Sequence, residues 1–330
     1  MSQPLPTHVE FRASNGVRIA GLMSERVSRN ATPATDAVRI LAVHGWLDNA
    51  ETFSPMTAAL LDRVQKHSRA SLLAIDFPGH GLSDPLPLSQ TYFAWDHALA
   101  ILDVAKAVRW PRFVLIGHSM GGSVAVLFAS AFPEMVSDLI VIESLGHVNR
   151  FPKGQDAAVM REFMEARRAI NLQMAEDDSV EVLKSKNTFP TLEEAARARM
   201  EGVVRVSFQA AMMLAKRGVD EAPGGGFRWN SDKRLKARHF WRWDHEGVED
   251  QLRAITARIL VVMGDDSNIF KSADALVSRR IQILKEERPA SEGNPVETRV
   301  EWISGGTHHL HLEQETAGEV ARTVAEFLSL

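Results

Sequence analysis

A glycine-framed serine constrains the fold of this chain more than any other feature. The pentapeptide Gly117-His118-Ser119-Met120-Gly121 follows the apolar run Phe113–Ile116 and precedes apolar residues at helical spacing that stop at Pro133. This pattern predicts a buried strand, a sharp bend at Ser119 and then a helix. Such a bend brings strand and helix so close that positions 117 and 121 require glycine. The serine hydroxyl is thereby pushed out of the sheet, where other groups can reach it.

Strand and helix patterns alternate along most of the chain. Seven further strands are expected, at Val9–Arg12, Val17–Leu22, Ile40–Val43, Leu72–Ile75, Leu139–Ile142, Ile259–Met263 and Arg299–Ile303. The first two flank Asn15-Gly16, a pair that favours a tight antiparallel hairpin. Helices are expected from Ser54, over Phe93–Val108 and over Thr316–Leu328. The alternation predicts an α/β fold with a mostly parallel eight-stranded sheet and helices on both faces.

One long stretch, from about Ser144 to Trp243, shows no strand pattern. It is charged and helical, and a capping box at Thr191–Glu194 follows Pro190. The alternation resumes afterwards, which indicates an insertion into a single domain. We therefore expect a core formed by residues 1–143 and 246–330, and a helical cap at 144–245, inserted after the sixth strand over the carboxyl edge of the sheet.

The composition excludes several classes of protein. With 45% hydrophobic and 24% charged residues and a net charge of −4, the chain is an ordinary globular protein with no basic surplus for nucleic acid or anionic membranes. It has no cysteine, which excludes disulfides, thiolate nucleophiles and cysteine metal sites. There is no apolar run of membrane-spanning length, and Met1–Thr7 has no apolar signal-peptide region. A cytoplasmic location is the default expectation.

A serine hydroxyl becomes a useful nucleophile only with a base within hydrogen-bond reach and a carboxylate that orients the base. Three histidines after the last strand are candidates for the base: His308, His309 and His311. They follow the turn Gly305-Gly306, which lets the chain swing back toward Ser119.

The negative oxygen that forms on an attacked carbonyl needs two backbone N–H donors, each contributing about 3 kcal/mol. Met120 directly follows the serine and should supply one. Trp46 follows His44-Gly45 at the end of the strand Ile40–Val43 and should supply the other, because that loop faces the bend. The side chain of His44 is expected to have a structural role.

Several motifs together resemble those of the α/β-hydrolase superfamily, and within it the serine hydrolase-like proteins. They are His44-Gly45-Trp46-Leu47-Asp48-Asn49-Ala50, Asp76-Phe77-Pro78-Gly79-His80-Gly81-Leu82-Ser83, Gly117-His118-Ser119-Met120-Gly121-Gly122, Phe132-Pro133-Glu134-Met135 and Asn230-Ser231-Asp232-Lys233-Arg234-Leu235. The resemblance covers nearly the whole chain, is strongest up to Glu143 and is weak in the predicted cap.

The resemblance selects among the candidate side chains. The distance in sequence from His308 to Glu313 matches the family pattern, so His308 is the expected base. The family usually places its acid at the third position after the glycine that ends the strand Ile259–Met263, and here that position is Ser267. Asp266 is the nearest substitute and the first choice. Glu143, at a position that some relatives use, is the alternative, followed by Asp265.

The resemblance also implies an activity. A serine at position 119, where dehalogenases and epoxide hydrolases have aspartate, favours acyl transfer to water. We expect a cofactor-independent, metal-free serine hydrolase of small carboxylic esters, with amides and thioesters as further candidates, acting as a monomer or homodimer. The alternative is a ligand-binding protein of the same fold with vestigial turnover, or a lyase on this fold.

Tryptophans and arginines gather in the second half of the predicted cap. They are Trp229, Trp241 and Trp243, with Arg228, Arg238 and Arg242. These side chains could line an apolar acyl pocket with a basic rim, or they could lock the cap to the core by stacking and packing.

Overall fold

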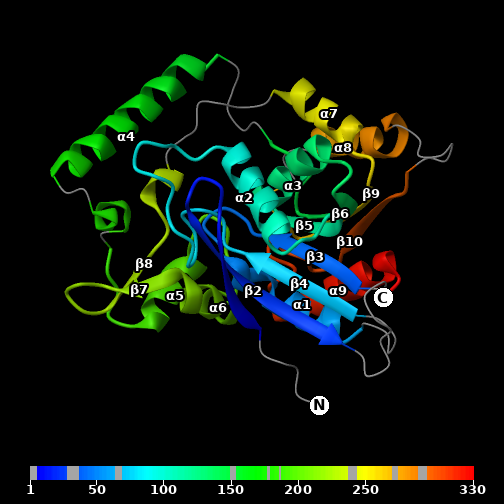
Figure 1. The fold of residues 1–330 in the computed structure, drawn as a ribbon, viewed down its shortest axis with the longest axis horizontal. Helices are drawn as coiled ribbons and strands as arrows, with labels where there is room; N and C mark the ends of the chain where they lie inside the picture. Colours follow the sequence, from blue (N-terminus) through cyan, green and yellow to red (C-terminus); the bar gives the residue numbers. More distant parts are fainter. Residues whose placement is uncertain are drawn as a thin grey trace.

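A computed structural model of the chain describes residues 6–27, 37–63, 69–148, 154–176, 179–185, 187–236, 244–269, 274–288 and 296–330 (Figure 1). Its centre is an eight-stranded sheet with the order β1-β2-β4-β3-β5-β6-β9-β10. The strands are β1 (Thr7–Arg12), β2 (Arg18–Val27), β3 (Ala37–Val43), β4 (Arg69–Ile75), β5 (Phe113–His118), β6 (Val136–Ile142), β9 (Arg258–Gly264) and β10 (Thr298–Ile303). The predicted fold class is confirmed.

The opening hairpin supplies the antiparallel part of the sheet. β2 pairs antiparallel with both β1 and β4, whereas β4, β3, β5, β6, β9 and β10 pair in parallel. β2 is longer than the sequence pattern predicts and continues past Leu22 to Val27, which pairs with Arg69. The polar residues Ser24–Arg26 are held in the strand because β4 satisfies their backbone hydrogen bonds.

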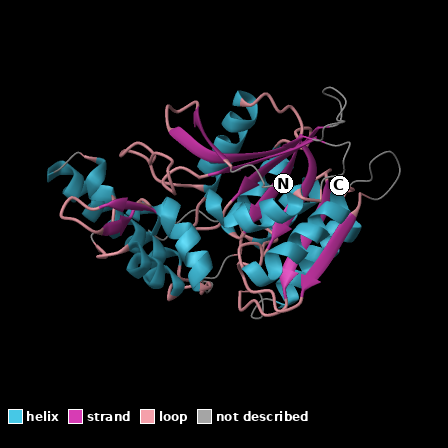
Figure 2. Cartoon of the chain, turned by 90° about the horizontal axis from the view of Figure 1, so that it is seen from below, coloured by secondary structure: helices cyan, strands magenta, loops and turns pink. Residues whose placement is uncertain are grey.

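Helices cover both faces of the sheet (Figure 2). On one face lie α1 (Ser54–Leu61) and α9 (Gln314–Leu328), and on the other α2 (Ala94–Ala107), α3 (Met120–Ala131), α7 (His245–Ala254) and α8 (Asp274–Gln282), which continues as a π-helical segment at Ile283–Glu287. The alternation of side chains along β3 explains the two layers, since Leu41 and Val43 pack in one apolar cluster and Ile40 and Ala42 in the other.

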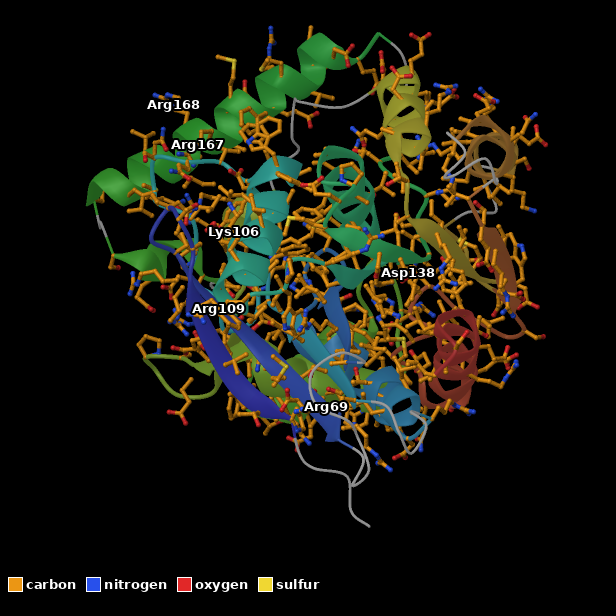
Figure 3. All side chains as sticks on the ribbon, turned by 45° about the vertical axis from the view of Figure 1, so that its right-hand side comes forward. Arg69, Lys106, Arg109, Asp138, Arg167 and Arg168 are labelled. Carbon is orange, nitrogen blue, oxygen red and sulfur yellow. The ribbon has the colours of Figure 1, made fainter. Side chains whose placement is uncertain are left out.

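Between β6 and α7 the chain leaves the sheet, and we call this part the insertion (Figure 1). It contains α4 (Asp156–Glu176), η2 (Val180–Leu183), α5 (Leu192–Met200), α6 (Phe208–Gly218), β7 (Val219–Glu221), β8 (Phe227–Trp229) and η3 (Lys233–Lys236). α5 and α6 have a small apolar core of their own, which includes Ala196, Ala211 and Leu214 and extends to Leu312 of the sheet-bearing part. On α4, Arg167 donates a hydrogen bond to the carbonyl of Leu88 at 2.7 Å, which links the insertion to the loop before α2 (Figure 3).

The insertion is not entirely helical, which corrects the expectation from sequence. β7 and β8 form an antiparallel pair whose turn contains Gly225 and Gly226, with φ of 90° and 77°. A side chain at Gly226 would also lie 2.5 Å from the carbonyl oxygen of Phe189. Strands of three residues are too short to give a recognisable alternating pattern, so only the glycine run marked the turn.

The insertion ends before α7, whose first residue is His245 and whose Val248 and Leu252 pack in the main core. Within the described ranges, no helix combines the length and the apolar character that a membrane crossing demands.

Candidate active site

Ser119 lies at the bend between β5 and α3, with φ of 52° and ψ of −114°. The predicted need for glycine is confirmed at both flanking positions. A Cβ atom at Gly117 would lie 2.5 Å from the carbonyl oxygen of Gly121, and one at Gly121 would lie 2.3 Å from the carbonyl oxygen of Val43. The neighbouring backbones therefore approach more closely than any side chain allows, and they hold Ser119 in its strained conformation.

The structure brings Ser119, His308 and Glu143 together. The Oγ atom of Ser119 lies 2.9 Å from Nε2 of His308, and Nδ1 of His308 lies 3.0 Å from Oε2 of Glu143. A carboxylate accepts hydrogen bonds, so Nδ1 carries the proton and Nε2 is left to accept from the serine hydroxyl. This arrangement suits transfer of the serine proton to His308.

Glu143 directly follows β6 and is 1% exposed. Its backbone has φ of 52°, and its N–H donates to the carbonyl of Val262 on β9. Its carboxylate accepts hydrogen bonds from the backbone N–H of Gly264 at 2.7 Å and from Oγ of Ser267 at 2.5 Å. The side chain is therefore fixed from the neighbouring strand while it faces His308.

This geometry corrects the first prediction for the acid, Asp266, and also the last one, Asp265. Both side chains are exposed at the turn after β9, where Asp265 accepts a hydrogen bond from the N–H of Gly305 and the N–H of Asp266 donates to the carbonyl of Gly306. The buried position in this turn belongs to Ser267, which is 3% exposed. Both aspartates are thus exposed in this turn, and the alternative, Glu143, occupies the place beside the histidine.

Burial lowers the pKa of the candidate base, His308. His308 is 6% exposed, and desolvation lowers its pKa below the ordinary value, although the hydrogen bond to Glu143 acts in the opposite direction. A base with a lowered pKa stays neutral, and therefore able to accept a proton, at a more acidic pH.

The other histidines that the sequence analysis considered make different contacts. Nε2 of His309 lies 3.0 Å from Oδ2 of Asp48, and Nε2 of His311 shares a hydrogen bond of 3.0 Å with the hydroxyl of Thr52. His44 is fully buried: its Nδ1 donates to the carbonyl of Gly45, and its Nε2 accepts from the N–H of Phe77. These contacts agree with a structural role for His44.

The two expected oxyanion donors come from the start of α3 and from the loop after β3. Met120 is the first residue of α3, where backbone N–H groups have no acceptor inside the helix. Trp46 follows Gly45 in the loop after β3, and a side chain at Gly45 would lie 2.9 Å from Nδ1 of His118. Trp46 is 44% exposed, and its Nε1 donates to the carbonyl of Leu235 in the insertion.

Two cavities meet at Ser119, with volumes of about 300 and 450 Å³. The smaller is lined mainly by apolar residues of the sheet-bearing part, among them Phe93, Trp95, Met120, Val124 and Ile269, together with Val148 at the start of the insertion. The larger is lined by the loop after β3 and by the insertion, with Trp46, Phe189, Ala198, Arg199, Trp229 and Lys236 in its wall. A carbonyl group at Ser119 would thus have space on both sides.

One of the three cap tryptophans, Trp229, lines the larger cavity, as one of the two interpretations of the sequence expects. The nearby Arg228 is instead paired with Glu181 inside the insertion. The other members of that group, Arg238, Trp241, Arg242 and Trp243, lie outside the described residues.

A second buried polar cluster beside Ser119 was missed from sequence. Asp48, His118 and His309 lie close enough together to hold a metal ion, and Nη2 of Arg199 from α5 lies 2.9 Å from Oδ1 of Asp48. The guanidinium also lies 3.3 Å from Nε2 of His309, so the positive charge of Arg199 lies beside this cluster. The only available signal was the position of Asp48 in the motif that begins at His44.

Comparison with known proteins agrees with the fold. The family profile described as alpha/beta hydrolase fold matches residues 38–308. A serine hydrolase-like protein of Danio rerio is 28% identical over 291 residues, which are 88% of this chain and 81% of the relative. A probable serine hydrolase of Drosophila melanogaster is also 28% identical, over 88% of this chain and 80% of the relative.

Solved structures give the same result. A hypothetical protein from Pseudomonas aeruginosa aligns with a TM-score of 0.76 and 29% identity, over 99% of this chain and 100% of the other. A thioesterase domain from the curacin biosynthetic pathway aligns with a TM-score of 0.69 over 97% of this chain and 99% of the other, but at 19% identity it supports the fold alone. The protein is thus a hydrolase that resembles the serine hydrolase-like proteins, and the chain belongs to the α/β-hydrolase fold family.

Proposed function

We propose that the protein is a cofactor-independent serine hydrolase of carboxylic esters, with thioesters and amides as related substrates. The observation that carries this proposal is the chain of two hydrogen bonds from Ser119 through His308 to Glu143, of 2.9 and 3.0 Å. A serine hydroxyl aligned on a buried, neutral imidazole is the arrangement that acyl transfer requires.

In the proposed reaction, Oγ of Ser119 attacks the substrate carbonyl while Nε2 of His308 takes its proton. The tetrahedral intermediate then collapses, the bond to the alcohol breaks, and His308 gives the proton to the leaving oxygen. Water attacks the resulting acyl-enzyme with His308 again as base, which releases the acid and restores Ser119. Glu143 holds the imidazole in the required tautomer and stabilises it when it is charged.

The amides of Trp46 and Met120 are the proposed donors to the oxyanion. Both residues adjoin Ser119 in the cavity walls, Trp46 in the larger cavity and Met120 in the smaller. Each donor is expected to contribute about 10²- to 10³-fold to kcat, because it meets charge that develops only in the transition state.

The two cavities suggest the shape of the substrate. Since Ser119 borders both, the favoured ester carries a substantial group on each side of its carbonyl. We further propose that residues 1–143 and 246–330 form the catalytic core and that 144–245 act as a cap, because the insertion supplies one wall of the larger cavity.

A fluorophosphonate probe tests this function directly. Folded protein should be labelled at Ser119, the Ser119→Ala variant should not, and a p-nitrophenyl ester should give a burst of one p-nitrophenol per site. Binding of esters with neither labelling nor burst would instead support a ligand-binding protein with vestigial turnover. Turnover without any covalent intermediate would support a lyase.

A further inference from the structure

The loop after β3 is attached to the insertion through three side chains. Nε1 of Trp46 donates to the carbonyl of Leu235 in η3, and Nδ2 of Asn49 donates to the carbonyl of Leu214 in α6, both at 2.9 Å. Between them, Oδ1 of Asp48 accepts from Nη2 of Arg199 in α5, also at 2.9 Å. Three residues of one loop therefore contact three elements of the insertion. This loop also carries the Trp46 amide, one of the two proposed oxyanion donors.

Asp48 connects this docking site with the candidate base. Its second oxygen, Oδ2, accepts from Nε2 of His309, the residue after His308, at 3.0 Å. Oδ2 also lies 3.9 Å from Nδ1 of His118, whose Nε2 donates to the carbonyl of His308 at 2.9 Å. The carbonyl of His308 and the side chain of the next residue, His309, are thus held by groups that converge on Asp48.

The charges in this cluster fit such a role. The Asp48 side chain is 2% exposed and that of Arg199 is 15% exposed, so the pair is largely shielded from water. Burial acts to raise the pKa of Asp48, but His309, Arg199 and His118 together hold it well below its ordinary value. The carboxylate is therefore charged, and a buried charge strongly favours the geometry in which its partner from the insertion is in place.

We propose that Asp48 is a positioning residue, which couples the docked insertion, through Arg199, to the Trp46 amide and to His308. Docking of α5 fixes Asp48, and Asp48 in turn fixes the loop of the oxyanion donor and the segment that carries the base. This inference rests on the proposed serine hydrolase function. It adds that the site is fully assembled only when the insertion is seated.

Two substitutions separate this role from a simple contact with substrate. Asp48→Asn removes the charge with little change in shape, and Arg199→Met breaks the link from the side of the insertion. We expect each to slow acylation of Ser119 by a fluorophosphonate, and by p-nitrophenyl acetate, on the order of 100-fold, since small displacements of catalytic groups have effects of this size. KM for the small acetate ester should hardly change. The double variant should be no slower than the slower single variant, because both changes break one connection.

The matched control is Arg205→Met, which removes another arginine of the insertion. Its side chain is 83% exposed, and its Nη2 lies 3.7 Å from Oε2 of the exposed Glu201. It should react at the rate of the unmodified protein. Arg199→Lys should recover part of the rate, and Trp46→Phe, which keeps an aromatic ring but lacks the donor to Leu235, should slow acylation even if the Asp48 variants fail to fold.

The pH profile gives a readout that a merely structural role would not change. Glu143, His309, His118 and Asp48 face His308, and the charge of Asp48 acts to raise the pKa of His308. Asp48→Asn should therefore move the acidic limb of kcat/KM to lower pH. If the unmodified protein is labelled and Asp48→Asn, Arg199→Met and Trp46→Phe are acylated at the same rate as it is, the role of Asp48 is overturned while the proposed hydrolase function stands. No labelling of the unmodified protein would overturn the proposed function and the inference together.

Discussion

Ser267 donates a hydrogen bond of 2.5 Å from its Oγ to Oε2 of Glu143, the same carboxylate oxygen that lies 3.0 Å from Nδ1 of His308. Ser267 stands at the sequence position where the resemblance to α/β-hydrolases leads one to expect the acid itself. In this protein the carboxylate comes from the end of the adjacent strand, β6, and Ser267, in the turn after β9, is its hydrogen-bond donor.

The identity of the acid can be tested by two isosteric substitutions. Glu143→Gln should lower kcat/KM for a p-nitrophenyl ester by roughly 10³- to 10⁴-fold, because an amide no longer selects the correct tautomer of His308 or stabilises its charged form. Asp266→Asn is the control and should stay within about twofold of the unmodified protein, since its side chain is exposed. The opposite ranking would restore Asp266 as the acid.

The hydroxyl of Ser267 should matter for both stability and activity. Ser267→Ala leaves a buried carboxylate short of one donor, which should lower the free energy of unfolding by about 1–3 kcal/mol and kcat by about tenfold. Urea unfolding and steady-state kinetics measure the two effects. Ser267→Thr keeps the hydroxyl and should retain most of both; an equal loss in the threonine variant would point to packing rather than to the hydrogen bond.

Because of the close approach at the Ser119 bend, alanine substitutions at two glycines should have opposite effects on stability. Gly121→Ala places a Cβ atom 2.3 Å from the carbonyl oxygen of Val43, and we expect it to lower the free energy of unfolding by at least about 3 kcal/mol. Gly318→Ala, in α9, places the new methyl group where no atom of another segment lies within 4 Å, and it should stabilise the protein by about 0.5–1 kcal/mol. Chemical denaturation compares the two variants, and equal effects would contradict the close approach of β3 and α3.

Acid should destabilise the protein well above the pH at which carboxylates titrate. Desolvation lowers the pKa of His44, His80, His118 and His311 in the folded state, so these residues are neutral there, while the unfolded chain binds protons below its ordinary pKa of about 6.5. The folded state gains its full stability from these neutral histidines above about pH 6.5. Below that pH the free energy of unfolding falls by up to about 1.4 kcal/mol per pH unit for each such histidine. Urea unfolding between pH 7.5 and 5.5 measures this slope; a constant free energy of unfolding would show that the cluster accepts protons while folded.

The two cavities at Ser119 should bind opposite ends of the substrate. Val148→Trp narrows the smaller cavity and Ala198→Trp the larger. Each should reduce kcat/KM for esters that are long on one side of the carbonyl, and the two variants should affect opposite sides. A panel of esters that varies the acyl and alcohol groups independently measures this, and identical profiles for both variants would mean that one cavity alone binds substrate.

The architecture could be predicted because its signals are local. An unbroken apolar run such as Ile40–Val43 indicates a buried strand, and the glycines around Ser119 indicate a bend that no other residue allows. Such patterns depend on neighbours along the chain. The short strands β7 and β8 and the polar end of β2 lacked these signals, because pairing with other segments holds them in place.

The sequence by itself determined the positions of the eight strands of the main sheet and of the bend at Ser119, and its resemblance to known hydrolases selected His308. Only the tertiary structure decided which carboxylate stands behind that histidine and what Asp48 contacts. Glu143 and Ser267 are 124 positions apart, and they meet because β6 and β9 are parallel neighbours with Ile142 paired to Val262. Asp48 and Arg199 are 151 positions apart and meet because the insertion folds back over the loop after β3. Contacts of this kind are set by how strands pair and segments dock, and no pattern of neighbouring residues encodes them.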